Sequence, residues 1–176
     1  MISASTILQT VATAAKPWAS LYSDSRAVSS AVTFLHLGGL LFAGGVAIAT
    51  DRATFRALRG TDDDRSRLLV DLGNTHAWVV TGLSVIFVSG LLLALSDVKT
   101  FLPSPTYWTK MSLVALLLVN GALLQRTEQK LRAGALLTQS AAPVQRLWRR
   151  LRFAAASSMV LWTAIVLAGV ILVETS

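Results

Sequence analysis

The sequence predicts an all-α integral membrane protein, a four-helix bundle of two antiparallel transmembrane hairpins that forms one domain over residues 1–176. Two observations predict this fold class. Hydrophobic residues make up 53% of the chain and charged residues only 14%, and the mean hydropathy is +0.60, whereas soluble domains carry about 25% charged residues. The charges that do occur gather between four long apolar segments.

Each apolar segment is long enough to cross a bilayer, because a hydrocarbon core about 30 Å thick needs about 20 apolar residues. Three of the four contain no charged residue. The third in chain order includes Lys110 near its start, whose long side chain can reach the membrane edge, with Tyr107 and Trp108 as interfacial aromatics beside it. We therefore expect spans at about 27–50, 72–96, 107–126 and 153–173.

Basic residues set the orientation that we expect. The connections 51–71 and 126–152 hold 12 of the 16 lysines and arginines. The positive-inside rule places such connections in the cytoplasm, which puts both termini on the periplasmic side of a bacterial inner membrane. The net charge of +7 is confined mainly to these connections, so we expect the lipid bilayer as a partner and no nucleic acid.

Residues 1–26 predict an N-terminal interfacial helix. Its apolar residues recur at helical spacing, and Pro17 is expected to interrupt it; a partly ordered tail is the alternative. Between the first two spans, the acidic run Asp62–Asp64 is expected to cap the second helix, with Asp64 as the N-cap residue. The apolar positions of the interfacial helix are Ile7, Val11, Ala15, Trp18 and Tyr22.

Cysteine is absent, which leaves no thiolate for nucleophilic chemistry or iron–sulfur ligation. His36 lies inside the first span, and Gly39, Ala43 and Ala47 follow it on the same helix face. Small residues at this spacing allow close approach of another helix, or of a flat macrocycle. Three roles stay open for His36: a structural hydrogen bond across helices, a haem or metal ligand, and a proton-transfer or quinone site.

His76 lies near the start of the second span, where an interfacial role is the simplest interpretation. Counted from the turn between the spans, His36 and His76 are roughly 18 Å apart along the membrane normal, so one haem held by both is disfavoured. Two polar layers fit better. We expect an outer layer of His36 and Lys110, and an inner layer in which His76 lies with Asn120 and Gln125.

The first span and its exit read FLHLGGLLFAGGVAIATDRATFRALRG, and the third span begins YWTKMSL. The chain resembles small bacterial four-helix membrane proteins of unknown function. It is also distantly similar to copper-resistance D-type proteins and to membrane protoporphyrinogen oxidases. In the oxidases a first-helix histidine and a third-helix lysine matter, so the resemblance implies His36 and Lys110 as the functional pair. The basic residue expected within the first helix of the oxidases has no counterpart inside this span, and Arg52 lies at its exit.

The sequence assigns no catalytic residue. The leading hypothesis is a redox-associated inner-membrane protein with haem b, a quinone or a metal ion near His36. Candidate cofactor-binding residues are His36, Lys110 and His76, and the candidate metal ligand is His36. The alternative is a non-catalytic scaffold or accessory subunit that contacts other membrane subunits or a second copy of the chain.

Overall fold

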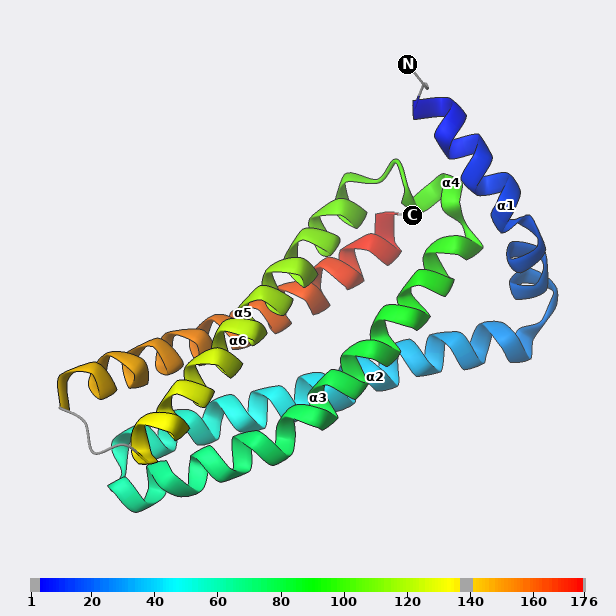
Figure 1. The fold of residues 1–176 in the computed structure, drawn as a ribbon. Helices are drawn as coiled ribbons and strands as arrows, with labels where there is room; N and C mark the ends of the chain where they lie inside the picture. Colours follow the sequence, from blue (N-terminus) through cyan, green and yellow to red (C-terminus); the bar gives the residue numbers. More distant parts are fainter. Residues whose placement is uncertain (1–3, 137–140, 176) are drawn as a thin grey trace.

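The computed structural model describes residues 4–136 and 141–175, and over these ranges every regular element is a helix. Four helices, α2, α3, α5 and α6, are long and apolar enough to cross a membrane. Each predicted span falls within one of them, which confirms the all-α four-helix bundle (Figure 1). The helices are α1 (Ala4–Asp24), α2 (Arg26–Arg59), α3 (Asp62–Ser96), α4 (Val98–Phe101), α5 (Pro105–Leu136) and α6 (Ala141–Thr175).

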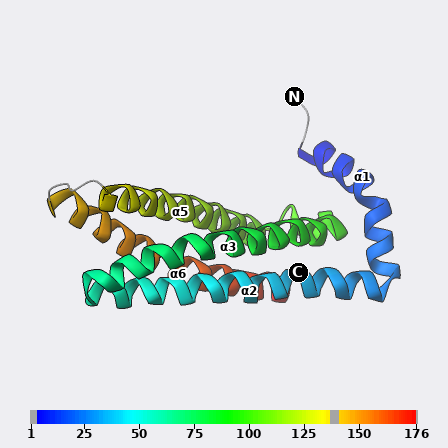
Figure 2. The ribbon, with the colours of Figure 1, turned by 60° about the horizontal axis from the view of Figure 1, so that its bottom comes forward.

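The long helices pair as two antiparallel hairpins, α2 with α3 and α5 with α6. The hairpins meet mainly through α2 and α6, whereas α3 and α5 barely touch. Figures 1 and 2 show the α2–α3 turn at the same end as the close of α5 and the start of α6, opposite both chain ends. We call it the Arg-rich end, because it carries the connections 51–71 and 126–152.

A capping box starts α3 at the tight turn after α2. Thr61 is the N-cap residue: its hydroxyl accepts from the Asp64 N–H, and its own N–H donates to the Asp64 carboxylate. The prediction that Asp64 is the N-cap was therefore wrong, because Asp64 occupies the third helical position and closes the box. The hydrogen bonds from the Thr61 backbone and hydroxyl lower the pKa of Asp64 below its ordinary value.

Small residues bring α2 and α3 into close contact at mid-membrane. A Cβ atom added at Gly82 would lie 2.7 Å from the Ala43 Cβ, and one added at Gly39 would lie 2.9 Å from the side chain of Ile86. Ala43 is fully buried and packs with Trp162 of α6. The predicted strip of small residues on α2 therefore packs against helices of this chain.

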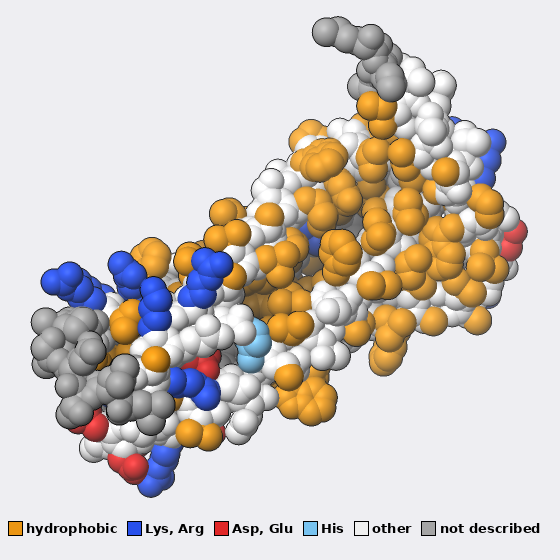
Figure 3. Space-filling view, in the orientation of Figure 1, with side chains coloured by type: hydrophobic (Ala, Val, Ile, Leu, Met, Phe, Trp, Pro, Cys, Tyr) orange, Lys and Arg blue, Asp and Glu red, His pale blue; other side chains and the backbone are white. Residues whose placement is uncertain are grey.

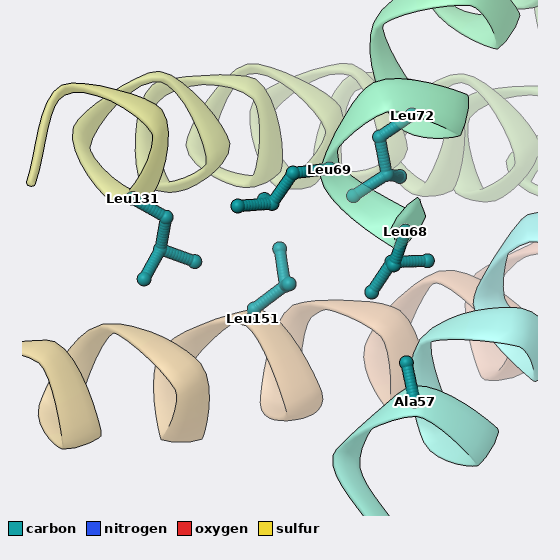
Figure 4. Packing of buried hydrophobic residues seen from close by; sticks show 6 residues of the cluster. All are labelled: Ala57, Leu68, Leu69, Leu72, Leu131 and Leu151. Carbon is teal, nitrogen blue, oxygen red and sulfur yellow. The ribbon is translucent and has the colours of Figure 1, made fainter. Parts of the chain in front are cut away.

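A second apolar core lies at the Arg-rich end, where all four long helices converge (Figure 4). Beside it, Arg132 of α5 pairs with Glu128 at 2.8 Å and also donates a hydrogen bond to the Leu69 carbonyl of α3. Glu128 is buried, and the hydrogen bond from Arg132 to Leu69 fastens α5 to α3. The core residues are Ala57, Leu68, Leu69, Leu72, Leu131 and Leu151.

The helix α1 runs through Pro17 without interruption, so the predicted break is wrong. Proline removes one backbone hydrogen bond and bends a helix that tertiary contacts hold together, and Figure 2 shows α1 changing direction along its length. The Trp18 indole N–H donates to the Leu92 carbonyl at 2.8 Å, which ties α1 to the C-terminal part of α3. Residues 1–3 of the predicted interfacial segment lie outside the described residues.

Candidate functional site

His36 faces the interior of the bundle because it shares a helix face with Gly39 and Ala43. Only 8% of the residue is exposed. Its Nδ1 lies 3.1 Å from the Ser89 hydroxyl oxygen and 3.2 Å from the Ile86 carbonyl oxygen, both on α3. A histidine inside a span is thereby held in one orientation by the neighbouring helix.

These partners indicate which ring nitrogen carries the proton. The Ser89 hydroxyl donates to the Val85 carbonyl at 2.6 Å, so its oxygen acts as an acceptor toward His36. The Ile86 carbonyl can only accept. With two acceptors facing Nδ1, we assign the proton of the neutral ring to Nδ1, which leaves Nε2 with its lone pair.

Lys110 lies at the same level of the bundle, on α5. It precedes Leu113, Val114 and Leu117 by three, four and seven residues, so it shares their inward face. Its side chain is half-buried, and a Cβ atom added at Gly169 of α6 would lie 3.6 Å from the Lys110 Nζ. Gly44 of α2 packs on Trp162 of α6, and His36 and Gly169 lie eight and seven residues from that contact toward the same end of the bundle, so His36 and the Lys110 ammonium lie at similar heights. His36 and Lys110 therefore both face the interior of the bundle at a similar level.

This layer lies beside a groove between the two hairpins. Since α3 and α5 make few contacts, the surface is hollowed between them, and Figure 3 shows hydrophobic side chains along both rims with a basic side chain at the floor. The groove opens sideways toward the lipid. A ligand with an apolar body can enter it from the bilayer and meet polar groups at its floor.

The predicted contact of His76 with Asn120 in an inner layer is not formed. The Asn120 amide donates to the Ala154 carbonyl at 2.9 Å, linking α5 to α6 instead of pairing with His76. His76 is half-buried and forms no hydrogen bond within the described ranges. It lies 13 residues before Ser89 on α3, about 20 Å along the helix axis. The two histidines therefore belong to different levels, as their sequence positions predicted.

Sequence reasoning missed Asp51 as an interior residue. It is 3% exposed, and its Oδ2 has no hydrogen-bond partner within the described residues. The buried Thr54 follows it by one turn of α2, and the Ser158 hydroxyl of α6 faces its carboxyl group. The sequence spacing could have shown its burial, because Asp51 follows Ala43 and Ala47 at intervals of four and so continues the inward face of α2.

The described residues contain no group of three or more His, Cys, Asp or Glu that could hold a metal ion. The fold and the site together define a multi-pass α-helical membrane protein with a donor and an acceptor group inside the bundle. In comparisons with protein families, curated proteins and solved structures, nothing matches this chain.

Proposed function

We propose that this chain is a bacterial inner-membrane protein that binds a quinol or quinone between His36 and Lys110. The Lys110 ammonium donates hydrogen bonds, and the free Nε2 of His36 accepts one. A hydroquinone offers the matching groups, since one hydroxyl donates to Nε2 while the oxygen across the ring accepts from Lys110. This donor–acceptor pair at an apolar groove is the observation that carries the proposal.

The membrane orientation is part of the proposal. With the Arg-rich end in the cytoplasm, as the positive-inside rule favours, both termini are periplasmic and the site lies in the outer half of the bilayer. Lipid-soluble quinones reach that depth by diffusing within the membrane. The resemblance to membrane protoporphyrinogen oxidases supports the same pair of residues, since their first-helix histidine and third-helix lysine correspond to His36 and Lys110.

A haem or a metal ion at His36 has less support. Nε2 offers a single ligand, which is enough for a five-coordinate haem b but not for a protein-held metal ion. A flat macrocycle would need the strip of Gly39 and Ala43, and α3 and α6 side chains already fill that strip. A quinone ring is smaller and needs only the floor of the groove.

The competing proposal is a non-catalytic accessory subunit whose partner lays a helix in the groove between α3 and α5. The open side of the groove favours it. Substitution of Ala43 by leucine does not test it, because Ala43 is buried in the chain's own core. The two proposals differ at Lys110, whose loss weakens quinol binding in the first and leaves a protein partner bound in the second.

A titration tests the proposal. A short-chain hydroquinone analogue is added to the full chain in detergent, and tryptophan fluorescence reports binding, because Trp162 packs in the core beside the site. Loss of one charged hydrogen bond in Lys110→Met is expected to weaken binding by about tenfold or more. The exposed Lys99, on the same side of the bundle, supplies the control Lys99→Met, for which we expect the wild-type affinity.

Two results would count against the proposal. Equal affinity in Lys110→Met and wild type would remove the lysine from the site. A Soret band in the absorption spectrum of the purified protein would favour haem over a quinone at His36.

A further inference from the structure

A second cavity lies between α2 and α6 at the Arg-rich end, far from the groove that holds His36. Its volume is about 330 Å³, and it is lined by Phe55, Leu58, Arg59 and Arg152. Pockets for small ligands in proteins begin at about 300 Å³. The lining combines an apolar wall with two guanidinium groups from different helices.

Neither Arg59 nor Arg152 lies within ion-pair distance of an aspartate or glutamate in the part of the chain that the structure describes. Their charges are therefore not balanced by the protein, and the cavity is suited to an anion. The ion pairs of the described residues are Arg65–Asp62, Arg67–Asp63 and Arg132–Glu128.

By the span bounds expected from the sequence, the cavity lies at the depth of lipid headgroups. Arg152 directly precedes Phe153, which is 76% exposed and begins the apolar stretch of α6. Arg59 is the last residue of α2, beyond the end of the first apolar segment. A group bound between them is level with the boundary between hydrocarbon and water, with Phe55 and Leu58 on its apolar side.

We propose that this cavity binds the phosphate of an anionic phospholipid. The planar guanidinium fork matches two phosphate oxygens, and two forks from neighbouring helices can hold one phosphodiester from both sides. Phe55 and Leu58 then contact the glycerol and the first methylene groups of the acyl chains. Basic pockets between transmembrane helices recognise lipid headgroups by this combination of charge and apolar surface.

Thermal unfolding of the full chain in an uncharged detergent tests the proposal. Three probes are added separately over a range of concentrations: phosphatidylglycerol, phosphatidylcholine and inorganic phosphate. A ligand that binds the folded state raises the unfolding midpoint according to its affinity. We expect phosphatidylglycerol to raise the midpoint, and phosphatidylcholine and inorganic phosphate to raise it much less.

The variants separate this cavity from general attraction to a basic surface. In Arg59→Gln/Arg152→Gln we expect the apparent affinity for phosphatidylglycerol to fall by about tenfold or more. The control Arg56→Gln/Arg149→Gln removes the same charge from the same helices, at positions that are exposed like Arg59 and Arg152 but do not line the cavity. We expect its affinity to stay within about twofold of wild type.

Equal losses in the two double variants, or no loss in either, would overturn the proposal. An effect of inorganic phosphate as large as that of phosphatidylglycerol would overturn the lipid as ligand, because a free anion would then suffice. If Arg59→Gln/Arg152→Gln does not purify as a folded protein, the single substitutions are compared with Arg56→Gln alone. Each must weaken the phosphatidylglycerol effect more than that control does, and the proposal fails if neither does.

Discussion

The His36 ring on α2 is joined to the Ser89 hydroxyl on α3 by a 3.1 Å contact at Nδ1. Ser89 is 2% exposed and donates to backbone carbonyls of its own helix, so we assign it as the acceptor from His36. This contact links two helices, and with the proton assigned to Nδ1 the lone pair of Nε2 can accept a hydrogen bond. A structural hydrogen bond and a ligand-binding nitrogen are thus compatible on one side chain.

Moving the His36 ring should weaken ligand binding. A Cβ atom added at Gly90 would lie 3.0 Å from the His36 Cε1, so in Gly90→Ala the ring must give way by a few tenths of an ångström. We expect the affinity for the hydroquinone analogue to fall severalfold. The control Gly45→Ala adds the same methyl group in open space and should bind as wild type does. Equal binding by both variants would contradict the assigned ring position.

The close contact of α2 and α3 predicts a strong effect at Gly82. A Cβ atom there would meet the Ala43 Cβ at 2.7 Å and its backbone Cα at 3.4 Å, so Gly82→Ala should destabilise the protein by about 1–3 kcal/mol. In α5, no atom lies within 4 Å of a Cβ at Gly121, and Gly121→Ala should be neutral or slightly stabilising. Unfolding by titration with a denaturing detergent measures both.

The hydrogen bond between Asn120 and the Ala154 carbonyl should contribute modestly to stability. Interhelical hydrogen bonds in membrane proteins are worth about 0.6 kcal/mol on average, so we expect a loss of this order in Asn120→Ala. Gln125 lies on the same helix and makes no hydrogen bond within the described ranges. Gln125→Ala is the matched control, and a larger loss there than in Asn120→Ala would contradict the assignment.

Removing Arg132 should cost more than removing an exposed arginine. Its partner Glu128 is 5% exposed and would be left as a buried, unpaired charge. The Arg132 side chain is itself 41% exposed. We therefore expect Arg132→Met to destabilise the protein by about 1–3 kcal/mol, which is less than the cost of breaking a fully buried ion pair. The exposed Arg67–Asp63 pair supplies the control, and Arg67→Met should change stability by less than about 1 kcal/mol.

The proposed orientation can be tested by labelling, because the chain has no native cysteine. We expect Ser104→Cys, in the turn before α5, to react with a membrane-impermeant maleimide in cells whose inner membrane is intact. Asp63→Cys, at the start of α3, should react only after permeabilisation. The reverse pattern would place the Arg-rich end outside.

Hydropathy predicted the spans because lipid leaves the helix as the only single-segment structure that satisfies its backbone hydrogen bonds. Helical periodicity predicted which residues of each helix face inward. The predicted inward placement of His36 agrees with the fold for this reason. The expected break at Pro17 failed because contacts such as the Trp18–Leu92 hydrogen bond stabilise α1 beyond its local propensity. Asp64 failed as a cap because Thr61, three residues earlier, competes for the same role.

Partners across helices were harder to predict than faces. Sequence spacing shows which residues share a face of one helix. It does not show how two helices are tilted against each other, or which pairs of helices lie apart in the bundle. Asn120 therefore pairs with a backbone carbonyl of α6, and not with His76 of α3. Asp51 was assigned to the membrane edge by its charge, although its position on the inward face of α2 governs its burial.

The quinone content of the purified protein tests the central claim most directly. The chain is isolated from bacterial membranes in mild detergent, and quinones are extracted and quantified per mole of protein. We expect a substantial fraction of wild-type and Lys99→Met molecules to carry quinone, and about a tenth of that fraction in Lys110→Met. Wild-type protein that carries no quinone and binds none when it is added would contradict the account.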